Sequence, residues 1–265
     1  MAILFDLDGV FYQADKPVAS AVEVAHWASE NAIAHLFLTN TSSKPRSALI
    51  EKLERFGIMI DEAHILTPPV ATVRWLRKNL AGEKIALFVA DKTRVEFSGI
   101  EIVQPGEDAA AVVVGDLGSG WDFAILNRAF RMLMAEPKPR LIALGMTRYW
   151  QADDGLRLDV APFVMALAYA AEVEPLVMGK PARSFYQAGI DILAEPAEQI
   201  VMVGDDIRAD VGGAQQAGLK TVLVRTGKFR QGDLELGIKA DAVLDSVADF
   251  PVWYEETIIG RKRRK

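Results

Sequence analysis

Short apolar runs alternate with amphipathic segments along most of this 265-residue chain. Runs such as Ala2 to Phe5 and Ile200 to Val203 contain no polar residue, which predicts strands that are buried on both faces. Segments with apolar residues at helical spacing follow these runs, for example at 20–31, and a further helix is predicted at 209–217. Strands that alternate with helices predict parallel pairing through right-handed crossovers, and therefore a doubly wound α/β sheet.

The middle of the chain carries strands and helices of its own. Six elements are predicted there, at 84–90, 100–103, 109–114, 122–135, 140–144 and 162–172. The polar stretch from Thr147 to Val160 precedes the last of them and is interpreted as a connector or a specificity loop. These elements suffice for an inserted α/β domain. The predicted division is a first core part at 1–79, an inserted domain at 80–176 and a second core part at 177–265.

Composition narrows the class of protein. Hydrophobic residues make up 51% and charged residues 25%, which is typical of a globular protein, and the net charge of −6 argues against a nucleic-acid partner. The absence of cysteine excludes disulfides and thiolate sites and fits a reducing cytoplasm. No uncharged run approaches the roughly 18 residues that span a bilayer. We therefore expect a cytoplasmic protein without a membrane partner, whose basic run at 261–265 is a solvated tail.

Polar residues follow four of the apolar runs directly. These residues are Asp6 and Asp8, then Thr39, Asn40 and Thr41, then Lys180, and finally Asp205, Asp206 and Asp210. Taken alone, the first pair and Gly9 would fit an ordinary acidic turn. Because the carboxyl ends of parallel strands share one edge of a sheet, we expect all four groups to meet at one site.

The residue types at this expected site define its chemistry. Several carboxylates at close quarters repel one another and require a bound cation to stay ionised. Oxygen ligands without His or Cys favour Mg²⁺ over Zn²⁺. A cation, a lysine and small hydrogen-bond donors together neutralise the oxygens of a phosphoryl group. The pattern therefore predicts an Mg²⁺-dependent phosphoryl-transfer site.

The order of these motifs also resembles a known superfamily. Asp6-x-Asp8-Gly9, Thr39-Asn40, Lys180-Pro181 and Gly204-Asp205-Asp206-x-x-x-Asp210 are similar to the motifs of the haloacid dehalogenase-like (HAD) hydrolases. An insertion between the Thr and Lys motifs resembles the type IIA phosphatase branch, with its nitrophenylphosphatase-like and phospholysine phosphohistidine phosphatase-like groups. The resemblance implies a Rossmann-like core with an inserted α/β cap domain. The second acid at position 8 is typical of phosphatases and phosphomutases rather than dehalogenases.

The resemblance implies a role for each motif residue. Asp6 is expected to be the nucleophile that forms an aspartyl-phosphate, and Asp8 the general acid and base. Mg²⁺ would be held by the carboxylates of Asp6 and Asp205 and by the main-chain carbonyl of Asp8. The expected phosphate-binding residues are Thr39, Asn40, Thr41 and Lys180. Asp206 and Asp210 are expected to lie behind the metal ligands and to orient waters and Lys180.

The implied reaction is hydrolysis of a small phosphorylated metabolite. Alternatives on the same core are a phosphoamide or pyrophosphate hydrolase and a phosphomutase. A non-enzymatic binding protein that keeps the fold is a further alternative, against which the complete set of acids and Lys180 counts. Relatives form cap-mediated dimers, so the resemblance leaves a homodimer open.

Overall fold

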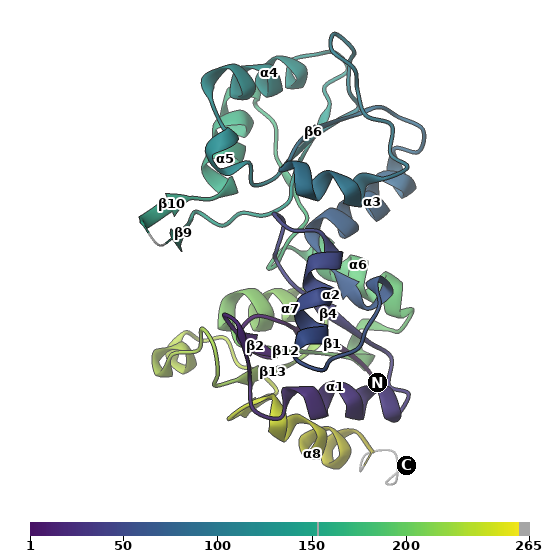
Figure 1. The fold of residues 1–265 in the computed structure, drawn as a ribbon, viewed down its shortest axis with the longest axis vertical. Coiled ribbons are helices and arrows are strands. Elements are labelled where there is room, and N and C mark those ends of the chain that lie inside the picture. Colours follow the sequence, from purple (N-terminus) through teal and green to yellow (C-terminus); the bar gives the residue numbers. More distant parts are fainter. Residues whose placement is uncertain (153, 260–265) are drawn as a thin grey trace. The chain divides into compact units, whose positions relative to one another are not determined.

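The computed structural model describes residues 1–152 and 154–259, so the basic run at 261–265 lies outside the described residues. The chain divides into two compact units, each of which combines segments that are distant in sequence (Figure 1). The core unit contains Met1–Thr39, Ser47–Leu66 and the chain from Tyr186 onward. The cap unit contains Asn40–Arg46 and Thr67–Phe185.

The core unit is built on a six-stranded sheet in the order β14-β13-β12-β1-β4-β5, in which every neighbouring pair is parallel. Its strands are β1 (Ala2–Asp6), β4 (His35–Leu38), β5 (Ile65–Leu66), β12 (Ile200–Gly204), β13 (Lys220–Val224) and β14 (Ala242–Leu244). The chain winds outward from β1 in one direction and from β12 in the other. The carboxyl ends of β1 and β12 therefore lie at the switch point where ligands bind in such sheets.

Helices cover both faces of the core sheet. Alternate residues of β1 face opposite sides: Ile3 and Phe5 pack with residues of α1 (Ala21–Glu30), α2 (Arg46–Arg55) and α8 (Phe250–Tyr254). Leu4 faces the other side, where it lies against Gly189 of α6 (Arg183–Leu193). The short helix α7 (Gly213–Gln216) precedes β13. This double coverage explains why the runs Ala2 to Phe5 and Ile200 to Val203 contain no polar residue.

The cap unit has its own parallel sheet, in the order β11-β8-β7-β6. The strands are β6 (Ile85–Phe88), β7 (Ala111–Val114), β8 (Arg140–Ala143) and β11 (Leu176–Val177). One face packs against α4 (Phe123–Leu133) and α5 (Val160–Ala171), and the other against α3 (Pro68–Asn79) and the 3₁₀ helix η2 (Asp91–Phe97). The predicted doubly wound α/β core with an inserted α/β domain is confirmed.

Three local predictions differ from the structure. The predicted strand at 100–103 is reduced to a single bridge between Ile102 and Ile85. The polar stretch from Thr147 to Val160 contains an antiparallel hairpin, β9 (Tyr149–Ala152) and β10 (Gly155–Leu158). The helix predicted after Asp205 begins with a π-helical turn, η5 (Ile207–Gly212). A second small hairpin, β2 (Tyr12–Gln13) and β3 (Lys16–Pro17), follows β1 and was not predicted.

The division into units also differs from the predicted boundaries. Helix α3 falls in the predicted first core part, yet Val73 and Leu76 pack in one cluster with Ile85 of the cap sheet. The loop Asn40–Arg46 joins the same unit. Thr93 Oγ1 donates to the carbonyl of Ser42 at 2.8 Å, which attaches this loop to η2.

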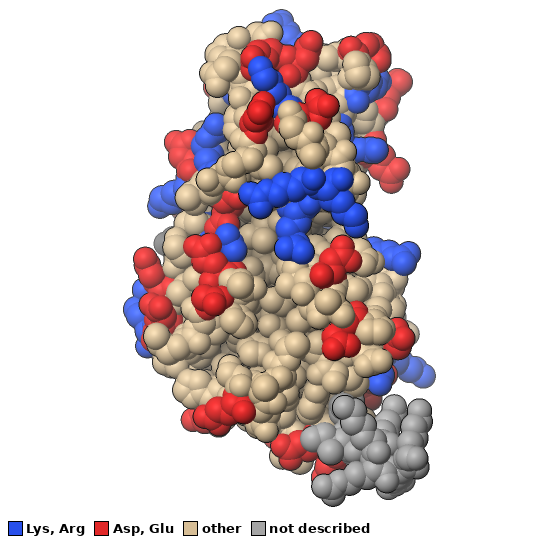
Figure 2. All heavy atoms as spheres, turned by 90° about the vertical axis from the view of Figure 1, so that its right-hand side faces the viewer, with Lys and Arg blue, Asp and Glu red and all other residues tan. Residues whose placement is uncertain are grey.

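The cap unit carries a basic surface on one side. Figure 2 shows Lys and Arg side chains gathered in a band across this face. Helix α3 exposes Arg74, Arg77 and Lys78, and Arg77 also donates to the carbonyl of Ser98 at 3.2 Å. None of the helices in the described part of the chain is long and apolar enough to span a membrane.

Candidate active site

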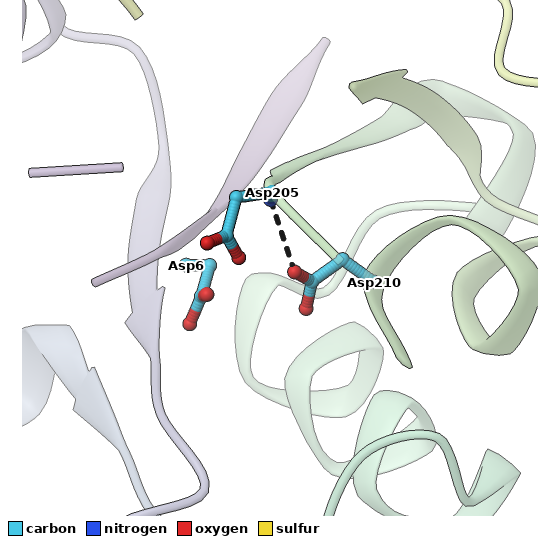
Figure 3. A group of neighbouring side chains, drawn as sticks. All are labelled: Asp6, Asp205 and Asp210. Atoms are coloured by element: carbon cyan, nitrogen blue, oxygen red, sulfur yellow. Dashed lines mark hydrogen bonds between the residues drawn. The ribbon is translucent and has the colours of Figure 1, made fainter. Parts of the chain in front are cut away.

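Three buried aspartates meet at the carboxyl ends of the two central core strands. Asp6 ends β1, Asp205 follows β12 directly, and Asp210 lies on η5. One carboxylate oxygen from each lies within 4.8 Å of those of the other two. Figure 3 shows the carboxylate of Asp6 close to that of Asp205, while Asp210 reaches back toward the main chain of Asp205. The side chains of Asp6 and Asp205 thus share one small space.

Main-chain N–H groups hold two of these carboxylates. Asp210 Oδ2 accepts from the N–H of Asp205 at 3.2 Å and from that of Asp206 at 3.1 Å. Asp205 Oδ2 accepts from the N–H of Lys228 at 2.6 Å. These hydrogen bonds fix the two carboxylates in position.

The carboxylate of Asp205 lies between two glycines. A Cβ atom at either Gly9 or Gly227 would lie 1.9 Å from Asp205 Oδ2. Both glycines have positive φ, +86° at Gly9 and +60° at Gly227. Thr226 Oγ1 donates to the carbonyl of Gly9, which joins the two turns. Only glycine leaves room for this carboxylate at both positions.

The π-helical turn that carries Asp210 is fixed by two side chains. Asp206 Oδ1 accepts from the N–H groups of Arg208 at 3.0 Å and Ala209 at 2.9 Å, so its side chain caps the turn. The hydroxyl of buried Tyr186 donates to the carbonyl of Ala209 at 2.7 Å. Burial, followed by the charge of Asp210, raises the pKa of Tyr186 well above its usual value, so the phenol stays a neutral donor.

Asp8 lies outside the buried group. Its side chain is exposed and accepts a hydrogen bond from the hydroxyl of Tyr12 at 3.4 Å. Burial, and then the charges of Asp8 and Asp6, raise the pKa of the Tyr12 phenol, which therefore remains protonated. Buried Thr39 follows β4, the strand beside β1, so it lies near the same edge of the sheet.

The strand that precedes Lys180 belongs to the cap sheet and not to the core sheet. This short strand, β11, pairs with β8 of the cap sheet, so the expectation that all four motifs follow strands of one sheet is wrong for Lys180. The side chain of Asn40 holds this residue in the cap unit. Asn40 Oδ1 accepts from the N–H of Lys180 at 2.7 Å, and Asn40 Nδ2 donates to its carbonyl at 3.0 Å. Thr41 belongs to the same unit.

Comparison with known proteins identifies the family to which the chain belongs. Residues 3–102 match the family described as haloacid dehalogenase-like hydrolase, and residues 177–250 match a HAD-hydrolase-like family. The phospholysine phosphohistidine inorganic pyrophosphate phosphatase of Rattus norvegicus is 36% identical over 252 residues, which cover 93% of this chain and 91% of that protein. The chain belongs to the HAD-like hydrolases.

Solved structures extend the similarity to the whole fold of this HAD-like hydrolase. A p-nitrophenyl phosphatase from Archaeoglobus fulgidus has a TM-score of 0.85 and 30% identity, and the match covers 94% of this chain and 97% of that one. A hypothetical protein from Pyrococcus horikoshii OT3 has a TM-score of 0.86 and 28% identity, with 95% and 98% covered. The predicted type IIA phosphatase branch is therefore confirmed.

The donor set of this hydrolase fits a hard divalent cation. Asp6, Asp205 and Asp210 are 4%, 0% and 1% exposed, so their charges are poorly screened by solvent. The three carboxylates offer oxygen ligands only, which suits Mg²⁺ better than softer metals. Because the carboxylate of Asp210 already accepts two main-chain N–H groups, Asp6 and Asp205 are the better placed pair of ligands.

Two features of the site were not predicted from the sequence. The loop Thr226-Gly227-Lys228 fixes Asp205, and Tyr186 fixes the turn that carries Asp210. The loop carries a recognisable signal, because Thr226 and Gly227 come shortly after the apolar end of β13 (Lys220–Val224). Tyr186 carries none, since a tyrosine within an amphipathic helix has the pattern of an ordinary core residue.

Proposed function

We propose that this chain is an Mg²⁺-dependent phosphatase that hydrolyses a small phosphorylated metabolite through an aspartyl-phosphate on Asp6. The buried group of Asp6, Asp205 and Asp210 supports this proposal most directly. It combines a carboxylate nucleophile with oxygen ligands at the switch point of a doubly wound sheet. Membership of the HAD-like hydrolases supports the same reaction.

The metal would be held by the carboxylates of Asp6 and Asp205 and by the main-chain carbonyl of Asp8. When bound, Mg²⁺ supplies positive charge to the oxygens of the phosphoryl group. Lys228 N–H and the two glycines keep Asp205 in place for this task. The carboxylate of Asp210 orients the main chain of Asp205 and Asp206 by accepting hydrogen bonds from their N–H groups.

In the first step, a carboxylate oxygen of Asp6 attacks phosphorus and the bond from phosphorus to the leaving oxygen breaks. Asp8 gives its proton to that leaving oxygen. In the second step, Asp8 takes a proton from a water whose oxygen attacks the same phosphorus, and the bond to Asp6 breaks. The exposed position of Asp8 is compatible with proton exchange between these steps.

The remaining motif residues are proposed to bind the phosphoryl group. Thr39 supplies a hydroxyl beside Asp6, and Thr41 is a second candidate donor. Lys180 supplies a positive charge that balances the phosphate and the nucleophile. We propose that Asn40 contributes to phosphate binding through Lys180, because its side-chain amide is hydrogen bonded to both main-chain groups of that lysine.

The test is hydrolysis of p-nitrophenyl phosphate by the purified chain in Mg²⁺ and in EDTA. Asp6→Asn is expected to abolish the Mg²⁺-dependent activity, with an unchanged circular dichroism spectrum. Asp15→Asn is the matched control, because its side chain is 92% exposed, and it is expected to retain full activity. An active Asp6→Asn enzyme would contradict the proposal, as would a wild type that is inactive with every divalent cation.

A finer candidate is hydrolysis of phosphorus–nitrogen bonds or of inorganic pyrophosphate. The rat relative is named for phospholysine, phosphohistidine and inorganic pyrophosphate, and it matches 93% of this chain. The same two steps apply, with Asp8 protonating a leaving nitrogen or a leaving phosphate. Release of inorganic phosphate from phosphohistidine, phospholysine, pyrophosphate and a panel of phosphate esters would rank these substrates by kcat/KM.

A further inference from the structure

The cap unit contains a cavity of about 570 Å³ beside its edge strand β6. Its lining comes from β6, the loop 102–108, α4 and η2. All of these belong to the cap unit, and none of the lining residues takes part in the proposed phosphoryl transfer. The volume lies within the range of small-molecule sites, which is about 300–1,000 Å³.

The wall that β6 contributes presents main-chain hydrogen-bonding groups. The N–H of Ile85 donates to the carbonyl of Glu101 at 2.8 Å, and its carbonyl accepts from Val103 at 3.1 Å. Successive residues of a strand direct these groups to opposite sides, so the N–H and carbonyl of Leu87 point the same way as those of Ile85. No described strand pairs with Leu87 on that side, although Leu87 lines the cavity. The edge of β6 at Leu87 thus offers one hydrogen-bond donor, the N–H, and one acceptor, the carbonyl.

The lining of the cavity is also basic. Arg94, Arg128 and Arg131 line it, and all three are exposed. Among the described residues, none of these arginines forms a salt bridge. The guanidinium carbon of Arg128 lies 5.1 Å from the centroid of the Phe88 ring, an arrangement that orients this cation. Three guanidinium groups are therefore available to an anion.

Two acids also line the cavity, Glu107 and Asp108. Glu107 is engaged elsewhere, because it forms an ion pair with Lys84 and accepts from the N–H of Gln104 at 2.8 Å. Both contacts hold the loop 102–108 in shape and lower the pKa of Glu107, the main-chain bond more than the lysine. The charge that remains at the cavity is positive, since three arginines face the single uncompensated acid Asp108.

We propose that this cavity binds a small ligand of the nucleotide class. A planar heterocycle would exchange hydrogen bonds with the N–H and carbonyl of Leu87, and its phosphate would be bound by Arg128 and Arg131. An extended peptide fits less well, because residues 101–103 already occupy the edge at Ile85 and shorten the open part. The site is built from residues other than the catalytic carboxylates, so it would bind its ligand without metal.

The experiment is isothermal titration of the full-length chain with AMP in EDTA, so that no Mg²⁺-dependent hydrolysis occurs. AMP is expected to bind about tenfold more tightly than ribose 5-phosphate, because only AMP carries the ring that pairs with the strand edge. Inorganic phosphate is expected to bind more weakly still. Arg128→Ala and Arg131→Ala are each expected to weaken AMP binding about tenfold.

Arg140→Ala is the matched control, since Arg140 is an exposed cap arginine outside the cavity, and it is expected to leave AMP binding unchanged. Thermal unfolding of each variant establishes that it is folded. Equal affinities for AMP and ribose 5-phosphate would overturn the proposal, as would no AMP binding at millimolar concentration. Loss of binding in Lys180→Ala but not in Arg131→Ala would also overturn it, because the nucleotide would then occupy the phosphatase site.

Discussion

The side chain of Asn40 hydrogen bonds to both main-chain polar groups of Lys180, a residue 140 positions away. Its Oδ1 accepts from the lysine N–H at 2.7 Å and its Nδ2 donates to the lysine carbonyl at 3.0 Å. Two hydrogen bonds to one residue fix both the position and the direction of the chain there. Asn40 is thus a positioning residue for the lysine that the proposed reaction requires.

Asn40→Ala is expected to lower kcat for p-nitrophenyl phosphate by about 10- to 100-fold. Two hydrogen bonds of about 1 kcal/mol each hold Lys180, and each 1.36 kcal/mol changes a rate tenfold. Asn40→Asp keeps the acceptor and loses the donor, so its kcat should fall between those of the wild type and Asn40→Ala. Asn79→Ala, which removes an exposed amide bonded within α3, is the control. Equal kcat values for Asn40→Ala and the wild type would refute the positioning role.

Mg²⁺ is expected to stabilise the folded chain. Three buried carboxylates repel one another without a cation, and a ligand at 100 times its Kd adds about 2.7 kcal/mol to the free energy of unfolding. Thermal unfolding in Mg²⁺ and in EDTA measures the shift in Tm. The shift should be lost in Asp205→Asn and retained in Asp15→Asn. An equal wild-type Tm in Mg²⁺ and in EDTA would contradict the proposed metal site.

The sequence predicted most of the core unit because its strands are buried on both faces. Short apolar runs such as Ala2 to Phe5, which end at a glycine-containing turn, are typical of buried strands, and the polar residues that follow such strands lie at the edge of the sheet. By that reasoning Asp6 and Asp205 were expected at this edge, and in the structure one carboxylate oxygen of each lies within 4.8 Å of the other. The prediction of the fold, which the structure confirms, depended on the same short apolar runs.

Features that depend on distant residues could not be predicted in this way. The strand before Lys180 has only two residues, Leu176 and Val177, and nothing in them specifies which sheet they join. The turn η5 depends on a hydrogen bond from Tyr186, which is 23 residues before its acceptor Ala209. The hairpin β9–β10 consists of two strands of four residues each and exposes Leu156 and Leu158, so its formation does not follow from burial of an apolar face.

Gly227→Ala is expected to weaken Mg²⁺ binding at least tenfold while the chain remains folded. The new Cβ would lie 1.9 Å from Asp205 Oδ2, so the carboxylate or the loop must move. The positive φ of +60° adds strain for any other residue. A tenfold change corresponds to about 1.4 kcal/mol of binding free energy, which titration calorimetry resolves.

The matched control for this loop is Gly232→Ala, where a Cβ meets nothing within 4 Å. Its Mg²⁺ affinity and its activity should equal those of the wild type. If Gly227→Ala bound Mg²⁺ as tightly as Gly232→Ala, the packing of Asp205 between two glycines would not determine metal affinity.

His35 is expected to make the stability of the core unit fall in mild acid. Burial of its ring lowers the pKa of His35, His64 lowers it slightly further, and the bond to the Ile33 carbonyl at 2.7 Å only partly offsets this. Its buried Nε2 has no hydrogen-bond partner among the described residues, so protonation there is unfavourable. A histidine whose pKa is lower in the folded state binds protons preferentially when unfolded. Its contribution to stability is therefore complete above about pH 6.5 and is lost as the pH falls below that value.

His35→Phe removes the titrating group and keeps an aromatic ring beside Phe5 and Phe37. Urea unfolding between about pH 7.5 and 5 should therefore give a flatter dependence of the unfolding free energy on pH than in the wild type. His26→Phe is the control, because the side chain of His26 is exposed and its ring hydrogen bonds to the carbonyl of Gly57, and its curve should run parallel to the wild type. Parallel curves for His35→Phe and the wild type would show that another group controls the acid sensitivity.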